Sequence, residues 1–266
     1  MIVKKWDNSD RCSEKNKECT SRMHLHNEDC LDYLQSLASE SVDMVLTDPP
    51  YFKIVKNDWD NQWKTEQEYL NWCLKWTREC IRVLKPGGSM IVWGTDKTDT
   101  YLNYRILVNG MKAGLTHHYQ GVWSYEWGAK SKKNITTKHE LWNHWTKGKP
   151  FTFNGDDIRI PYKMQNNTYR GKNTNHPLGK IPTSVWEKNN ITTSKEHCGW
   201  HPTTKNLFIL DRMIRAYTNP GEVVLDIFSG SGSTAIACER AGRRFWGCEK
   251  DADYYNKSLE RIECLK

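Results

Sequence analysis

The sequence predicts an α/β protein with a mostly parallel, twisted sheet flanked by helices. Short apolar segments at residues 42–47, 89–94, 223–228 and 244–249 have the length and the flanking turn residues of buried strands. Between them, apolar residues spaced by three or four predict helices, most clearly from 69 to 84. This alternation is typical of parallel sheets, and 266 residues suit one such domain with an insertion.

The N-terminal part begins with a polar segment. Residues 1–22 lack periodicity, which predicts a loosely ordered tail. Residues 23–26 are expected to form a short strand, and leucines at 31, 34 and 37 predict a short helix. Asp29 stands just before that helix, where an N-cap belongs. The apolar run from Val42 to Thr47 is the first long buried strand.

The segment Asp48-Pro49-Pro50-Tyr51 follows this strand, at the sheet edge where open α/β proteins bind ligands. Prolines donate no backbone hydrogen bond, so strand pairing is expected to end here and to leave carbonyls free for a ligand. Asp48 and the Pro49 carbonyl can each accept one hydrogen of an exocyclic amine, while Tyr51 stacks on the ring that carries it. A strand that simply ends in a polar, proline-rich turn is the alternative interpretation.

In the middle of the chain, the pattern predicts a loop with two tryptophans at residues 52–64, a helix at 69–84, a strand at 89–94 and a second helix at 102–113. Two aromatic β-rich segments follow at 117–127 and 139–147. Lys85-Pro86-Gly87-Gly88 is expected to stop the first of these helices. A basic loop at 128–134 joins the two β-rich segments. From Pro150 to His197, Asn, Thr, Lys and Pro dominate, and this stretch is too long for a simple connector.

The C-terminal third predicts a ligand-binding strand, turn and helix. A helix with apolar residues from Leu207 to Tyr217 precedes the strand at 223–228. Gly230 and Gly232 form the turn, and small residues there let the backbone approach a ligand at the N-terminus of the next helix. The strand at 244–249 ends in Glu249, a carboxylate that can accept from two ribose hydroxyls, and Asp251 is expected to cap the last helix.

The net charge of +7 is concentrated in one segment. Between residues 129 and 197, thirteen Lys and Arg stand against five Asp and Glu, so this segment holds more than the whole excess. Such a distribution is expected if the segment meets a polyanion while the rest of the chain binds a small cofactor. A solvated basic surface is the alternative.

Nine cysteines occur without a Cys-x-x-Cys pair, and we find neither a signal peptide nor a long apolar run. Reduced thiols in a cytoplasmic protein, with no membrane partner, are the simple interpretation. Cys12, Cys19, His24 and His26 do not have a standard zinc-ligand spacing, so no metal is predicted and a frayed tail is preferred there.

The segment at 48–51, together with Phe228-Ser-Gly-Ser-Gly-Ser-Thr234, resembles the amino-methyltransferases of DNA, which move a methyl group from S-adenosylmethionine to adenine N6 or cytosine N4. The catalytic motif precedes the glycine loop, which is the permuted order of the β group of that family. The resemblance implies a Rossmann-like methyltransferase fold. Residues 23–148 and 198–266 would form its catalytic and cofactor-binding domain, and residues 149–197 a loop-rich target-recognition insertion.

The resemblance also implies roles for particular residues. The target amine would be held by Asp48, Pro49, Pro50 and Tyr51. The cofactor would be bound by Asp29, Thr203, Lys205, Asp226, Phe228, Ser229, Gly230, Ser231, Gly232, Thr234 and Glu249, with Thr203 and Lys205 near its methionine end. Glu28 stands where the family has Gly, and Asn206 where it has Pro. From the charge of the basic segment, Lys130, Lys132, Lys133 and Arg170 are expected to contact double-stranded DNA.

Several alternatives remain at this point. Gly230 to Ala235 also fits a dinucleotide fingerprint, so a nicotinamide-dependent oxidoreductase is one, and a non-catalytic nucleic-acid-binding protein is another. Both leave parts of the sequence unexplained. RNA as the substrate, a homodimer and an endonuclease partner are also left open. Cytosine C5 chemistry is disfavoured because no Pro-Cys pair occurs, and Asp at position 48 favours adenine N6 over cytosine N4.

Overall fold

An eight-stranded sheet organises the protein, which is described here from a computed structural model that covers residues 22–54, 58–95, 102–126, 132–163, 168–169, 172–188 and 196–265. The strands are β1 (Met23–His26), β2 (Val42–Thr47), β3 (Leu84–Gly94), β4 (Thr116–Ser124), β5 (His139–Thr146), β6 (Thr168–Tyr169), β7 (Lys172–Asn173), β8 (Val185–Glu187), β9 (Val223–Asp226) and β10 (Arg244–Cys248). The helices are α1 (Cys30–Ser36), α2 (Glu66–Val83), α3 (Leu102–Lys112), α4 (Leu207–Tyr217), α5 (Ser233–Ala241) and α6 (Ala252–Leu265), with short 3-10 helices η2 (Asp58–Asp60) and η3 (Gly155–Ile158). The predicted tail lies outside the described residues except for Arg22.

The strand order is β1-β10-β9-β2-β3-β5-β4-β8. Strands β1, β10, β9, β2 and β3 pair in parallel, whereas β5 is antiparallel to both β3 and β4. The chain leaves β9 toward β10 on one side and leaves β2 toward β3 on the other, so the order reverses between β9 and β2. Ligands of open α/β sheets bind outside the carboxyl ends of the strands at such a point.

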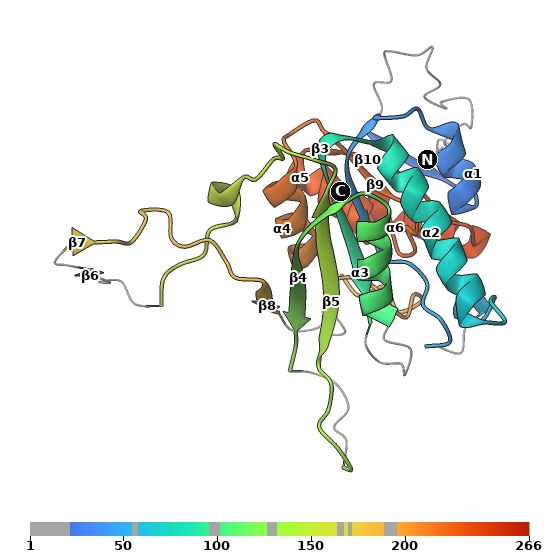
Figure 1. Ribbon diagram of the computed structural model, residues 1–266, viewed down its shortest axis with the longest axis horizontal. Helices are drawn as coiled ribbons and strands as arrows, with labels where there is room; N and C mark the ends of the chain where they lie inside the picture. The colour runs from blue at the N-terminus through green and yellow to red at the C-terminus, as the bar shows by residue number, and fades with distance from the viewer. Residues whose placement is uncertain are drawn as a thin grey trace.

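Helices cover both faces of the sheet (Figure 1). One apolar core contains the buried side chains of α4 and α5, together with Trp93, Trp123 and Trp142 from the sheet. The other core lies under α1 and α2 and includes Trp76 and Trp145. Strands buried on both faces need apolar residues at nearly every position, which explains why the predicted strands appear as continuous apolar runs.

Residues 85–88 differ from the prediction, because they belong to β3 and are not a separate turn. Helix α2 begins at a capping box between Thr65 and Glu68 and ends at Val83, and β3 starts at the next residue. The Gly87 amide donates to the Lys147 carbonyl, and the Lys147 amide donates to the Gly88 carbonyl. A Cβ on Gly87 would lie 2.4 Å from the carbonyl oxygen of Pro150, so glycine permits the chain after β5 to pass this close to β3.

Two segments project beyond the sheet (Figure 1). The chain between β4 and β5, described at residues 125–126 and 132–138, extends past the strand ends. The chain between β5 and β8 runs out as an arm with β6 and β7 near its far end, and it returns through an isolated bridge between Ile160 and Lys180. β8 then pairs in parallel with β4. As expected from its composition, the described part of this arm contains only short regular elements.

The cysteines of the described residues are all free, and most are buried. Cys12 and Cys19 lie outside those residues. Within the described ranges, no cluster of three or more His, Cys, Asp and Glu side chains is arranged to hold a metal ion. None of the helices described is long and apolar enough to span a bilayer.

Candidate active site

A cavity of about 910 Å³ opens at the carboxyl ends of β9 and β2. It is lined by nearly all the residues predicted for the target amine and the cofactor, namely Asp29, Asp48, Pro49, Pro50, Tyr51, Thr203, Lys205, Asp226, Phe228, Ser229, Gly230, Ser231, Thr234 and Glu249. Gly232 is the exception, since its Cα faces Ser258 and Ile262 of α6. Lys132 and Lys133 are exposed outside the cavity, and Lys130 and Arg170 lie outside the described residues.

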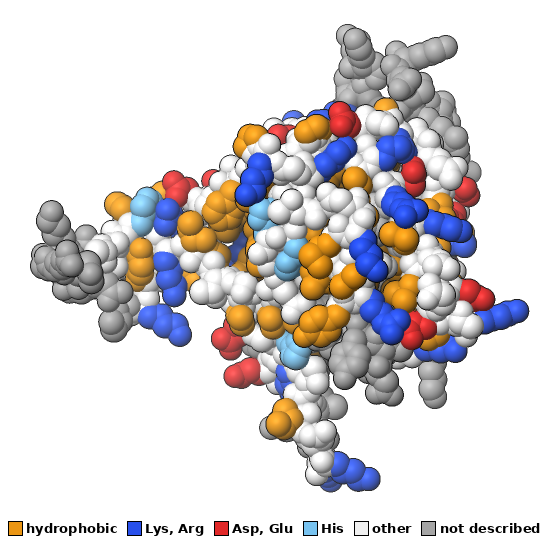
Figure 2. Space-filling model, viewed as in Figure 1, with side chains coloured by type: hydrophobic (Ala, Val, Ile, Leu, Met, Phe, Trp, Pro, Cys, Tyr) orange, Lys and Arg blue, Asp and Glu red, His pale blue; other side chains and the backbone are white. Residues whose placement is uncertain are grey.

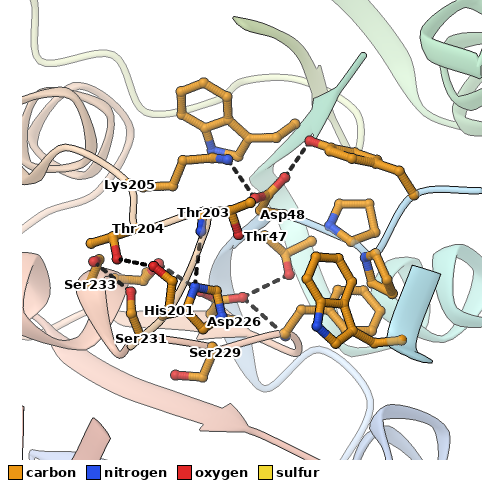
Figure 3. Close-up of a pocket in the computed structure, with 18 of the residues that line it drawn as sticks. Thr47, Asp48, His201, Thr203, Thr204, Lys205, Asp226, Ser229, Ser231 and Ser233 are labelled. Atoms are coloured by element: carbon orange, nitrogen blue, oxygen red, sulfur yellow. Dashed lines mark hydrogen bonds and ion pairs between the residues drawn. The ribbon is translucent and has the colours of Figure 1, made fainter. Parts of the chain in front are cut away.

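Both carboxylate oxygens of Asp48 accept from donors of the chain. The Tyr51 hydroxyl donates to Oδ1 at 2.5 Å, and Lys205 Nζ lies 2.5 Å from Oδ2. Figure 3 shows Lys205 pointing at Asp48. A stacking role for Tyr51 does not require its hydroxyl, so the contact with Asp48 is an additional function that the sequence did not indicate.

Lys205 is almost completely buried, with 10% of its side chain exposed. Its ammonium also lies 3.0 Å from Glu140 on β5 and 5.0 Å from the ring centre of Trp93 on β3. Burial alone would lower the pKa of Lys205, but the carboxylates of Asp48 and Glu140 outweigh burial and raise the pKa above its usual range. Lys205 is therefore a permanent cation next to Asp48.

Two buried side chains form hydrogen bonds with the backbone of the residues that follow Asp48. The Tyr51 amide donates to Asp60 Oδ1 at 2.6 Å, and the Tyr69 hydroxyl donates to the Pro50 carbonyl at 3.1 Å. Asp60 belongs to η2, in the segment expected to be an irregular loop. Trp63 from the same segment packs against Tyr69 in the core and does not line the cavity.

Asp226 ties the two central strands together at the floor of the cavity. Its oxygens accept from the hydroxyls of Thr47 at 2.7 Å and Thr234 at 2.6 Å, and from the amide of Phe228 at 3.1 Å. Burial raises the pKa of Asp226 to about 6, although these hydrogen bonds favour the ionised form. The carboxylate thus aligns the end of β2, the end of β9 and the start of α5.

The raised pKa of Asp226 predicts a pH dependence of stability. A carboxyl with a folded pKa above its unfolded value of 3.8 stabilises the fold fully below that unfolded pKa, and this contribution is lost as pH rises through the folded pKa of about 6. The loss of stability amounts to roughly 3 kcal/mol, because a shift of one pKa unit corresponds to about 1.4 kcal/mol. Between pH 4 and 7, urea titrations should therefore show wild type losing stability relative to Asp226→Asn. A constant difference between the two proteins over this range would contradict the assignment.

The glycine loop is fastened to Glu249. Glu249 Oε2 accepts from the Gly230 amide at 2.8 Å, and Oε1 accepts from the Asp251 amide at 2.9 Å. Gly230 has a positive φ of 49°, and a Cβ there would lie 2.7 Å from Nε2 of His201. Asp29 caps α1 through the Leu31 amide, as predicted, and also pairs with Lys250. The loop, Glu249 and Asp29 form one end of the cavity.

Several cavity residues were not among the predicted site residues, including Trp93, Glu140 and His201, whereas Trp59 belongs to the predicted loop with two tryptophans. The buried Nε1 of Trp59 has no hydrogen-bond partner among the described residues. Burial lowers the pKa of His201 to about 4, so this imidazole is neutral near pH 7. His201 stands close in sequence to the predicted Thr203 and Lys205, but no local signal marked Trp93 or Glu140, which come from strands distant in sequence.

The fold and the site together define a Rossmann-like methyltransferase. Asp226 at the end of β9 and the glycine loop that follows it share one cavity with the Asp-Pro-Pro-Tyr segment after β2. Solved structures have the same fold. One is the PvuII DNA methyltransferase (cytosine-N4-specific), at a TM-score of 0.70 and 21% identity over 92% of each chain. Another is an M1.HpyAVI-SAM complex, at a TM-score of 0.63 and 21% identity over 90% of this chain and 98% of that one.

Sequence comparison identifies the family. The family model described as DNA methylase matches residues 42–260. The DNA adenine methyltransferase YhdJ of Escherichia coli is 33% identical over 88% of this chain and 81% of its own length. The Type II methyltransferase M.BglII of Bacillus subtilis is 32% identical over 86% of this chain, which spans 66% of that relative. The chain belongs to the DNA methylase family of S-adenosylmethionine-dependent methyltransferases, so the predicted family, fold and cofactor are confirmed.

Proposed function

We propose that this protein methylates the exocyclic amine of a base flipped out of double-stranded DNA, and that the base is adenine, methylated at N6. The single observation that carries the proposal is that Asp48 and the Gly230–Glu249 end of the cavity face one shared space of about 910 Å³. That volume is at the upper end of ordinary ligand pockets, and it suits a cofactor with a base beside it. Asp at position 48 favours adenine over cytosine.

The residues at one end of the cavity fit S-adenosylmethionine. Glu249 uses one acceptor site on each oxygen for a backbone amide, and a carboxylate has about four such sites, so it can also accept from ribose hydroxyls. Phe228 lines the cavity and packs against Trp72, which offers an apolar surface for an adenine ring. Gly230 lets the backbone come close, and the N-terminus of α5 lies beside it.

The residues of the target end orient the amine and do not form a bond to it. S-adenosylmethionine supplies an electrophilic methyl group when bound. Asp48 and the Pro49 carbonyl accept the two amine hydrogens, which directs the nitrogen lone pair away from them, and the anionic Asp48 stabilises positive charge that develops on the nitrogen. Burial raises the pKa of Cys30, the cysteine that lines the cavity, far above its usual range, so its thiol stays protonated and supplies no nucleophile.

The projecting hairpin and the arm are proposed to hold DNA, with residues 149–197 as the target-recognition insertion. Figure 2 shows Lys and Arg side chains on the arm and at the tip of the hairpin. Lys132 and Lys133 are exposed on that hairpin, and Lys163 is exposed on the arm. Phosphate contacts position a protein on DNA, and base contacts then specify the site.

Sequencing of modified bases tests the proposed function. DNA from cells that lack other methyltransferases and express the wild-type protein should carry 6-methyladenine at one short sequence, and DNA from cells that express Asp48→Ala should not. N4-methylcytosine at that sequence would correct the base but keep the reaction. If purified protein with S-adenosylmethionine modified neither base in duplex DNA of varied sequence, the proposal would be wrong.

The basic hairpin predicts a salt-dependent affinity for duplex DNA. Replacing Lys130, Lys132 and Lys133 with Gln should weaken all duplexes alike and reduce the slope of log affinity against log salt by up to about 0.9 per lost phosphate contact. Replacing Lys75, Arg78 and Lys112 with Gln, on α2 and α3, is the matched control of equal charge. An equal slope for wild type and the hairpin variant would place the DNA-binding surface elsewhere.

Two partners complete the proposal. A homodimer would appear in light scattering at about twice the mass of 31.2 kDa. An endonuclease partner would cut the site identified by sequencing, and the methylated site would be protected from it.

A further inference from the structure

A chain of four polar side chains runs along the target end of the cavity. The Tyr51 hydroxyl contacts Asp48, Asp48 contacts Lys205, and Lys205 contacts Glu140. Tyr51 and Asp48 follow β2, Lys205 precedes α4 and Glu140 belongs to β5, so three separate parts of the chain meet there. The exposed fraction of the side chain is 10% for Lys205, 19% for Asp48 and 30% for Glu140.

We propose that Lys205 is a positioning residue for methyl transfer, which holds the Asp48 carboxylate in the orientation that accepts the target amine, and that Glu140 acts through Lys205. This inference rests on the proposed function and adds two residues to it. It assigns Lys205 to the target base, whereas the family resemblance alone suggested the methionine end of the cofactor. No proton moves in this role, because Lys205 remains an ammonium throughout.

The position of Lys205 favours a role at Asp48 over a purely structural one. A buried ammonium is unfavourable unless it is paired, and here both of its partners are in the cavity. Helix α4 does not depend on this side chain, because Asn206 is its N-cap and accepts from the Phe208 amide. The pairing of Lys205 thus contributes to the geometry of the cavity and not to the start of the helix.

The contacts of Asp48 leave room for the substrate. A carboxylate has about four acceptor sites, and Tyr51 and Lys205 occupy one on each oxygen. The remaining sites can accept from the amine without displacing either donor. Because both oxygens are held, rotation of the carboxylate about its side-chain bonds is restricted. Loss of this orientation matters for the rate, because a misplacement of about 1 Å at a reacting group lowers a rate by up to about 100-fold.

Glu140 determines where the ammonium of Lys205 lies. Without the second carboxylate, the ammonium would keep its contacts with Asp48 and with the face of Trp93 but would lose the one that draws it toward β5. Charge is also balanced by this arrangement, since the two carboxylates and one ammonium together leave one negative charge near the amine. That sign stabilises the positive charge that the amine gains as it is methylated, before the amine loses one proton to solvent.

The test combines Lys205→Met, Glu140→Gln and the double variant, with two measurements on each protein. One is the single-turnover rate of methyl transfer to duplex DNA with S-adenosylmethionine already bound. The other is the Kd for S-adenosylmethionine by calorimetry, which also reports that the variant is folded. Lys85→Met is the matched control, because Lys85 forms a 2.7 Å pair with Asp43 far from the cavity.

We expect Lys205→Met to reduce the rate about 100-fold while its Kd for S-adenosylmethionine changes less than about twofold. Glu140→Gln should reduce the rate about tenfold, and the double variant should be no slower than Lys205→Met, since Glu140 acts through Lys205. A structural role would not produce this non-additivity. The control should retain the wild-type rate. If Lys205→Met does not fold, Glu140→Gln alone still tests the proposal, because it must slow transfer with an unchanged Kd.

Three results would overturn the inference. A fall in cofactor affinity that matches the fall in rate would assign Lys205 to the cofactor. Additive losses in the double variant would mean that Glu140 acts independently of Lys205. Wild-type rates in both single variants would show that the ion pairs are dispensable. Absence of transfer by the wild-type protein is a different outcome, since it would overturn the proposed function itself.

Discussion

Replacing Asp48 with alanine is expected to abolish methyl transfer while binding of S-adenosylmethionine survives. The carboxylate is proposed to accept the target amine, and the loss of one preorganised polar group in an active site reduces a rate by about 100- to 1,000-fold. Among the described residues, the carboxylate of Asp48 contacts Tyr51 and Lys205, neither of which belongs to the glycine loop. We therefore expect the Kd for S-adenosylmethionine to remain within about threefold of wild type, which corresponds to a change of at most about 0.7 kcal/mol in binding free energy.

Asp43→Ala is a matched control for this variant. Asp43 belongs to β2, the strand that Asp48 follows, and is also paired with a lysine. It lies near the other end of that strand, where it accepts from Lys85 and from the Val223 amide. Its loss should affect stability and not the chemical step. The assays are single-turnover methyl transfer and calorimetry. Loss of transfer in Asp43→Ala, or a cofactor affinity that falls with the rate in Asp48→Ala, would contradict the assigned role.

The parts of the fold that could be predicted from the sequence depend on local patterns. Helix α5 follows the glycine turn, as expected. Glycine in the left-handed region stands at each end of it, since Gly232 and Gly242 have φ of 74° and 71°. The strand before Asp48 was equally clear, because a parallel strand covered on both faces is apolar at almost every position. Both signals lie within about ten residues of sequence, so no knowledge of tertiary contacts was needed.

The contacts that shape the site could not be predicted in this way. The partners Asp48, Lys205 and Glu140 come from distant segments, and each of these residues alone is compatible with an exposed polar position. Asp60 likewise gave no signal until η2 placed it under the Tyr51 amide. Side-chain pairing across the sheet edge depends on strand order and on the direction of each chain, which a single sequence does not specify.

Gly230→Val is expected to weaken S-adenosylmethionine binding by at least about 100-fold, or roughly 2.7 kcal/mol. The left-handed backbone at Gly230 costs about 1–2 kcal/mol for a residue with a Cβ, and more for a β-branched one. The added Cβ would also lie 2.7 Å from Nε2 of His201, so the loop or the imidazole has to move. Movement of the loop would break the 2.8 Å bond from the Gly230 amide to Glu249 and displace both from the cofactor end of the cavity.

Gly242→Val separates backbone strain from the effect on the site. Gly242 has a φ of 71°, close to the 49° of Gly230, but a Cβ there would meet no atom within 4 Å, and the residue does not line the cavity. Both variants should therefore melt at a lower temperature than wild type, whereas only Gly230→Val should lose affinity for S-adenosylmethionine in calorimetry below its melting temperature. Normal affinity in folded Gly230→Val would remove the glycine loop from the cofactor site. An equal loss in Gly242→Val would mean that general destabilisation, and not the contact with His201 and Glu249, weakens binding.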